Sequence, residues 1–372
     1  MKRIGIIIFA VLTAVLSSCS GEEILPDQVI DGVQPAPELV PLSIATGTQT
    51  KTVLSGTTVN WTADDQIAVF DDLHCLNCFD AVSVSGSSAV FEGKVAAKTT
   101  DFYAVYPYTS AIRADEDNIY VNLPMVQEPL AGSFAEEHNV SIAHGTKAVG
   151  DDDVDGVVFE NKCALLKFKI PSVFAYVAEA SFIAENRALV GNMVYSKGWD
   201  CFIGTTSGNS KVSLEGQMKG GQTYYFVVSP GEVRGFRLAV KDDDGVEMIN
   251  SSQKSFEAKA GVITDLGEVK IVINPSLRFD GTDVWFDIGL PKGAEKYIDS
   301  VEGWLSPNGQ ISSAYRIIVM SSESGNVRFP YLTIVFAGKN DIPSGSHILH
   351  LNYVIKGLGR FEEDFPVEVP VR

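Results

Sequence analysis

Residues 51–70 read KTVLSGTTVNWTADDQIAVF, and this stretch decides the fold class. The β-branched and apolar residues at 52–54 and 58–61 predict two short extended segments, and the polar residues at 62–65 predict a turn. The run QIAVF at 66–70 is apolar at every position after the first, as expected of a strand buried against another layer. The stretch therefore predicts a β-sheet protein.

Length and composition agree with a folded chain of this class. The chain has 372 residues, 45% of them hydrophobic and 20% charged, which is ordinary for two or three globular domains. Its 33 glycines and 16 prolines, with few long stretches of period 3.6, favour an all-β chain rich in turns. The formal net charge of −18 repels nucleic acid and anionic lipid headgroups, so we expect neither as a partner.

The N-terminus carries an export signal. Lys2 and Arg3 precede an apolar run at 4–16 that is too short to span a bilayer, and the run ends in L-S-S-C at Cys19. This ending resembles the lipobox of bacterial lipoproteins, in which the cysteine is acylated. The alternative is an ordinary signal peptide with an incidental cysteine. Small and acidic residues at 20–23 resemble a signal for transport to the cell surface, and 19–38 reads as a flexible tether.

A first domain is predicted over 39–150. Apolar or alternating runs recur at 81–84, 89–94, 102–106 and 119–123, and their spacing suggests a β-sandwich. Before them lies a short apolar strand with one proline, which is tolerated at a sheet edge or a strand start. Its residues are Leu39, Val40, Pro41, Leu42, Ser43 and Ile44.

The residues of this domain best suited to bind a metal or undergo redox chemistry are the C-x-x-C pair, Cys75 and Cys78, beside a histidine. A zinc site needs four ligands, and no second pair follows at the usual spacing, so we expect no metal. A redox-active pair belongs at the start of a helix, whereas this context is strand and loop. A local disulfide or two free thiols remain, as expected for an exported protein.

A second domain is predicted over 151–273 and a third over 274–372. The segment GDDDVDG at 150–156 resembles half of a calcium loop, but Lys162 stands where the loop requires an acid, so we interpret the segment as an acidic linker. The residues 242–245 predict a hairpin turn. In the third segment, five further strands predict a small sandwich. Its aromatic residues are interpreted mainly as core, and Trp304, beside a turn, is the exception best placed to contact a ligand.

Five pieces of the chain, in order, resemble the fimbrillin family of type V pilins and related surface lipoproteins. They are the lipobox, 51–70, 102–108 with 123–127, 157–170, and 224–231 with 260–269, so the resemblance covers roughly 19–273. It implies tandem transthyretin-like, Greek-key β-sandwich domains. It also implies that a protease removes the first strand and that the open groove then accepts a strand of another subunit.

Carried onto this chain, the removable strand is 39–44. The family's cleavage favours arginine, yet Lys51 is the one lysine or arginine between Cys19 and Lys94, so cleavage is expected there. Alternatively, the subunit keeps its lipid and acts as an anchor or a plain surface lipoprotein.

The sequence thus predicts a pilus subunit, or an accessory or tip pilin, that is anchored in the outer membrane and exposed at the cell surface. Its expected partners are other pilin subunits and a glycan or protein on a host or bacterial surface, with no cofactor. The alternative is a monomeric surface lipoprotein that binds glycan or protein through its C-terminal module. We expect no enzyme, because His138 and His144 stand beside no serine or cysteine nucleophile motif.

Overall fold

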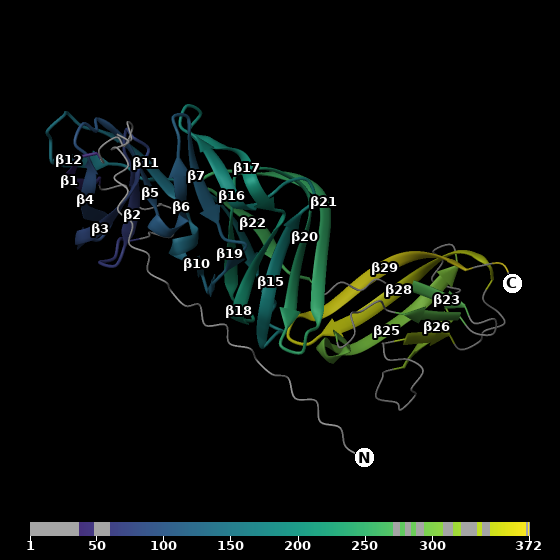
Figure 1. The fold of residues 1–372 in the computed structure, drawn as a ribbon. Helices are drawn as coiled ribbons and strands as arrows, with labels where there is room; N and C mark the ends of the chain where they lie inside the picture. Colours follow the sequence, from purple (N-terminus) through teal and green to yellow (C-terminus); the bar gives the residue numbers. More distant parts are fainter. Residues whose placement is uncertain are drawn as a thin grey trace, which may run out of the picture. The chain divides into compact units, whose positions relative to one another are not determined.

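The computed structural model describes residues 37–47, 60–270, 276–279, 284–287, 294–307, 315–320, 333–336, 343–369 and 371, and these residues lie mainly in β-strands (Figure 1). The helical pieces in this part of the chain are three short 3-10 turns: Tyr108–Ser110, Glu136–His138 and Ala294–Tyr297. The predicted all-β class is confirmed.

An eight-stranded sheet holds the N-terminal strands. Its order is β12-β1-β4-β3-β2-β5-β11-β13. The bounds are β12 Asp153–Val157, β1 Leu39–Thr46, β4 Ser88–Ala96, β3 Leu76–Ser85, β2 Gln66–Phe70, β5 Asp101–Tyr106, β11 Ser141–Thr146 and β13 Glu160–Asn161.

Three sheets and a small ribbon follow it. A four-stranded sheet has the order β17 Cys201–Asn209, β16 Val190–Ser196, β7 Asn118–Leu123 and β6 Ala111–Ala114. A five-stranded sheet contains β21 Glu247–Ala258, β20 Gly231–Asp242, β15 Tyr176–Ala184, β18 Lys211–Lys219 and β8 Val126–Gln127. A three-stranded sheet contains β19 Thr223–Val228, β14 Ala164–Lys169 and β22 Ile263–Glu268, and the ribbon pairs β9 Pro129–Leu130 with β10 Ser133–Phe134.

The C-terminal segment forms a seven-stranded sheet. Its order is β23 Ser276–Phe279, β24 Val284–Asp287, β27 Thr333–Phe336, β26 Tyr315–Met320, β25 Ile298–Pro307, β28 Gly345–Ile355 and β29 Gly359–Val369. The five strands predicted here are present, and β23 and β25 add to them.

Strand β2 separates two hydrophobic cores. Ile67 and Val69 pack into an N-terminal core with Phe79 and Phe91, whereas Ala68 and Phe70 face a larger main core. Successive side chains of a strand point to opposite faces, so the uninterrupted apolar run QIAVF fits a strand buried on both sides. The prediction for 66–70 is confirmed to the residue.

Trp61 fills the centre of the N-terminal core. Its ring lies edge-to-face with Phe91 at 4.9 Å, Tyr106 at 5.1 Å and Phe159 at 5.4 Å between ring centroids. The predicted turn that follows is confirmed, because Asp65 N–H donates to Thr62 O (3.2 Å). The predicted segments 52–54 and 58–59 lie outside the described residues, and the described end of the second segment, Asn60 and Trp61, is not part of a strand.

The acidic linker interpretation of 150–156 is wrong for its second half. Residues 153–157 form β12, which pairs in parallel with β1. Val157 is buried in the N-terminal core and Val154 packs against it. These two valines and the open edge of β1 hold the segment in the sheet despite its aspartates.

The predicted domain boundaries remain predictions. Strand β7, from the predicted first domain, pairs along its length with β16 of the predicted second domain. The predicted hairpin turn is confirmed, since Gly245 N–H donates to Asp242 O (3.0 Å) between β20 and β21.

Ile67→Ala tests the role of β2. Ile67 is completely buried, so its truncation leaves a cavity, and we expect the free energy of unfolding to fall by about 2–5 kcal/mol. Leu73→Ala is the control: Leu73 is 55% exposed, and we expect a change below about 0.5 kcal/mol. Urea denaturation measures both, and equal losses would contradict the burial of Ile67 in the N-terminal core.

Candidate functional site

The strand predicted to be removable is β1, and it is paired on both sides. It runs antiparallel to β4 over seven residue pairs, from Leu39 opposite Ala96 to Ala45 opposite Val90. It runs parallel to β12 from Ser43, which lies opposite Asp153. The second half of β1 therefore lies inside the sheet.

The backbone of β1 explains why a proline is accepted there. Ala97 N–H donates to Glu38 O (2.8 Å) on the β4 side, and Ser43 N–H donates to Asp152 O (2.7 Å) on the β12 side. Backbone groups of successive residues point to opposite edges of a strand, so odd-numbered residues of β1 face β12. Pro41 is odd-numbered and precedes the start of the β12 ladder, so its missing N–H interrupts neither ladder.

The side chains of β1 serve one core only. Leu42 and Ile44 are buried in the N-terminal core, and Ser43 between them faces the other side of the strand. Leu39 and Pro41 are exposed. In contrast to β2, β1 contributes nothing to the main core.

Two predicted site residues, Cys19 and Lys51, lie outside the described residues, so acylation and cleavage remain predictions. Strand β1, which lies between them in the sequence, is the part of the predicted maturation site that belongs to the described residues.

Cys75 and Cys78 are exposed free thiols. Burial, and then the negative charges of Asp71 and Asp80, raise the pKa of Cys75 and Cys78 respectively, which disfavours the reactive thiolate. Three extended residues span about 10 Å, more than the roughly 7 Å that a disulfide bridges between Cα atoms. The predicted disulfide would therefore require the first residues of β3 to leave their ladder with β2.

Trp304 lies in the middle of β25, and its ring stacks on His350 at 5.2 Å. Next to it is an arrangement that the sequence did not indicate. His350 Nε2 lies 2.7 Å from Ser306 Oγ, and His350 Nδ1 lies 2.6 Å from Asp364 Oδ1. This is the order of groups in a hydrolase triad, but Ser306 is fully buried, so no substrate reaches its hydroxyl in this conformation.

A second group of polar side chains fixes the tip of the β16–β17 hairpin. Lys162 is almost completely buried, and its Nζ donates to Glu160 Oε2 (2.8 Å) and Asp200 Oδ1 (2.7 Å). Tyr195 O–H also donates to Asp200 Oδ1. Asp200 has a φ of 52°, an uncommon conformation for a residue with a side chain, and these bonds hold it there.

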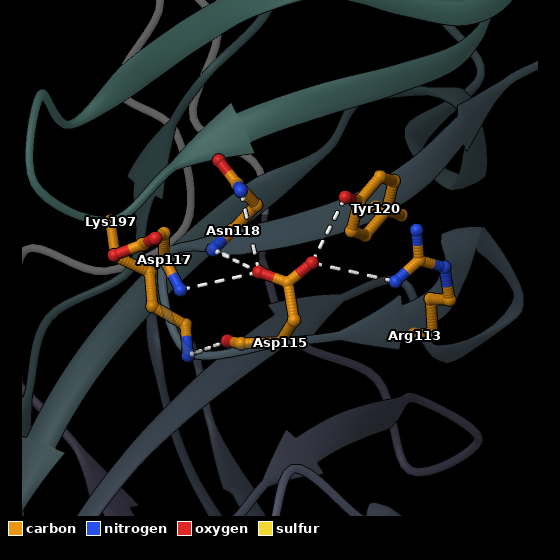
Figure 2. A network of polar contacts seen from close by, with 6 residues as sticks. All are labelled: Arg113, Asp115, Asp117, Asn118, Tyr120 and Lys197. Carbon is orange, nitrogen blue, oxygen red and sulfur yellow. Dashed lines mark hydrogen bonds and ion pairs between the residues drawn. The ribbon is translucent and has the colours of Figure 1, made fainter.

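The other side of the tip is attached to the β6–β7 hairpin (Figure 2). Lys197 Nζ donates to Asp115 O (2.6 Å), and Lys197 N–H donates to Asp117 O (2.9 Å). Asp115 in turn accepts hydrogen bonds from Asn118 N–H (2.9 Å) and Tyr120 O–H (2.9 Å). Burial by itself raises the pKa of the Asp115 carboxyl, but these hydrogen bonds lower it overall.

A hollow of about 550 Å³ lies beside this tip, and its lining is mainly polar. Consecutive residues of β11 and β12 form two of its walls. The side chains that carry its chemistry are Tyr103, His144, Glu160, Lys162, Lys197 and Asp200. His144 Nε2 lies 2.6 Å from Asp101 Oδ1, and the His144 ring stacks on Tyr103 at 4.6 Å.

Within the described residues, no group of three or more histidine, cysteine or acidic side chains is arranged to hold a metal ion. None of the helices in that part of the chain has the length and hydropathy of a membrane span.

No protein-family model matches the sequence, and no curated protein matches it. The chain is similar to a solved Bacteroides uniformis protein assigned provisionally to cell adhesion, with 17% identity, 64% of this chain and 95% of that chain covered, and a TM-score of 0.43. It is also similar to a fimbrial protein from Bacteroides vulgatus, with 9% identity, coverage of 60% and 95%, and a TM-score of 0.29. At these identities and TM-scores the likeness transfers no function.

Asp200→Asn tests the anchoring of the tip. Burial alone would raise the pKa of the Asp200 carboxyl, but hydrogen bonds from Lys162 and Tyr195 and the Lys162 charge lower it below its usual value. The ionised carboxylate therefore stabilises the fold above the unfolded-state pKa of about 4, and this contribution is lost as the pH falls through the lower, folded-state pKa.

We expect the variant to lose about 1 kcal/mol at pH 7, because Asp200 is itself largely exposed, and the gap to wild type should narrow below pH 4. Urea denaturation at pH 7 and pH 3 measures this. A gap that widens in acid would contradict the assignment.

Proposed function

We propose that this chain is a cell-surface pilus subunit or accessory pilin, lipid-anchored to the outer membrane through Cys19, that assembles by exchanging β1 for a strand of another subunit. The observation that carries the proposal is the one-sided burial of β1. It pairs with β4 along its length and with β12 over its second half, yet it contributes to one core only.

Loss of β1 would leave a groove with unpaired backbone groups and two empty apolar sites. The edges of β4 and β12 would lose their backbone partners together, and β1 is the one strand partner of β12 in the described sheet. The sites of Leu42 and Ile44 would open the N-terminal core to water, at a cost of roughly 1.5–3 kcal/mol for each side chain. A strand that restores these contacts would therefore bind tightly.

The geometry of the groove specifies the donor strand. It must run in the direction of β1, antiparallel to β4 and parallel to β12. It must present two apolar side chains at alternate positions, in place of Leu42 and Ile44. A proline is tolerated one residue before the first of them, because that backbone position needs no N–H.

The end of β29 carries this pattern. Residues 365–369 read FPVEV, which aligns with VPLSI at 40–44, including the proline at the tolerated position. Strand β29 is the last strand of its sheet and pairs with β28 alone, so its second edge is without a strand partner in the described sheet. To act as a donor, these residues would first leave their pairing with residues 345–349 of β28.

Lys51→Gln tests maturation. Trypsin treatment of the wild-type chain should release an N-terminal fragment that ends at residue 51 and yield oligomers that survive unheated SDS gels. The variant should stay uncut at that position and monomeric, because β1 remains covalently attached. Intact-mass spectrometry identifies the cut, and oligomers built from uncut Lys51→Gln chains would refute cleavage-driven exchange.

A peptide of residues 38–47 tests the groove itself. Added in excess during maturation, it should occupy the vacated site and shorten the oligomer ladder, because it restores both ladders and both apolar contacts. The same peptide with Leu42→Asn and Ile44→Asn should leave the ladder unchanged. Equal effects of the two peptides would show that assembly does not use this groove.

A further inference from the structure

An exposed tryptophan stands at the tip of the β16–β17 hairpin. Trp199 is 75% exposed, whereas Trp61, at the centre of the N-terminal core, is 3% exposed. Burying an aromatic ring is strongly favourable, so a ring left in water on a well-fixed turn is available for a partner. A single exposed apolar residue is common, so its neighbours decide its meaning.

The neighbours of Trp199 hold the turn rigid. Asp200, the next residue, is fixed by Lys162 and Tyr195, and Lys197 is fixed to the β6–β7 hairpin at two points. The ring is therefore presented by a backbone that has little freedom to lose when a ligand binds. Such pre-organisation increases the affinity that a given contact provides.

The residues on either side of Trp199 line two hollows, Asp200 the larger one and Gly198 a smaller one. Lys197 and Asp200 line the larger hollow, and the smaller one, of about 320 Å³, contains Lys197 and Gly198. Tyr103 and Lys197 line both hollows, so these two side chains form a shared wall between them. The turn that carries Trp199 thus stands beside two adjoining recesses.

The lysines of the larger hollow are already engaged. Lys162 is paired with Glu160 and Asp200, and His144 Nε2 lies 2.6 Å from Asp101 Oδ1. Lys197 bonds a carbonyl, and Asp115, Asp101 and Asp117 surround it with negative charge. The site has no spare cation for an acidic ligand, and it is too polar for an apolar one. Its paired carboxylates and lysines still offer charge-assisted hydrogen bonds to hydroxyl groups, which both donate and accept.

We propose that the β16–β17 tip and the adjoining hollows bind an uncharged oligosaccharide. The C–H face of one sugar ring stacks on Trp199, because the negative face of an aromatic ring attracts polarised C–H groups. The hydroxyls of the neighbouring sugar bond to the polar groups of the hollow, with Asp155 and His144 at accessible positions on its walls. Strand β12 forms one wall of the hollow and pairs with β1, so the binding test uses the uncut chain, in which β1 is in place.

The test is binding of the full-length secreted chain to a printed array of galactose-, mannose-, fucose- and N-acetylglucosamine-containing oligosaccharides, beside their sialylated and sulfated forms. We expect binding to one or more uncharged glycans. Titration calorimetry with the best of them should show about a tenfold loss of affinity for Trp199→Ala and a smaller loss for Trp199→Phe. Asp155→Ala should also weaken binding.

Tyr176→Ala is the matched control, because Tyr176 is 42% exposed on β15 and lines neither hollow. It should bind like the wild type, and all the variants should keep the wild-type urea midpoint, since the substituted side chains are exposed. Absence of binding to every uncharged glycan, binding to acidic glycans alone, or unchanged affinity of Trp199→Ala would each overturn the proposal. None of these results would affect the maturation tests with Lys51→Gln.

Discussion

The burial of β2 on both faces is the constraint on which the N-terminal half of the structure depends. Ile67 and Val69 belong to one core, and Ala68 and Phe70 belong to the other. Strand β5 repeats this division, with Ala104 in the N-terminal core and Val105 in the main core. Because strands shared by two cores cannot leave without exposing both, they hold the eight-stranded sheet in place.

Strand β1 has the opposite character. The second half of its backbone is paired on both sides, but its buried side chains reach one core. A strand of this kind contributes specificity through its ladder and a limited amount of apolar burial, which another strand can replace. The parallel strand β12 depends on the same neighbour, so the region around β1 forms a unit whose pairing changes together.

The hairpin tip at Trp199 uses polar contacts for positioning. Lys162, buried beside Glu160 and Asp200, holds one side of the turn, and Lys197 holds the other. A buried lysine that lost its carboxylates would be costly, so the turn has one favourable conformation.

The spacing of apolar residues was sufficient to predict the strands whose buried faces can be recognised in the sequence. The uninterrupted run at 66–70 and the alternating strands around it were predictable, because apolar residues occupy the positions of a strand that face a core. The segment at 39–44 was predictable as a strand for the same reason, and its proline restricted which edge could be paired.

Pairing partners were not predictable, because a sequence pattern records burial and not the neighbour that causes it. Residues 153–157 are rich in aspartate and glycine, and they form a strand only because β1, more than a hundred residues earlier in the chain, offers an edge. The contacts that fix the β16–β17 tip were likewise not predictable, since Asp200 and Lys162 are 38 residues apart and meet only in the folded chain. The sequence by itself determined the all-β class and the presence of a short strand near the N-terminus. The tertiary structure alone decided which edges meet and where an exposed tryptophan stands beside a polar hollow, because both depend on contacts between residues that are distant in the chain.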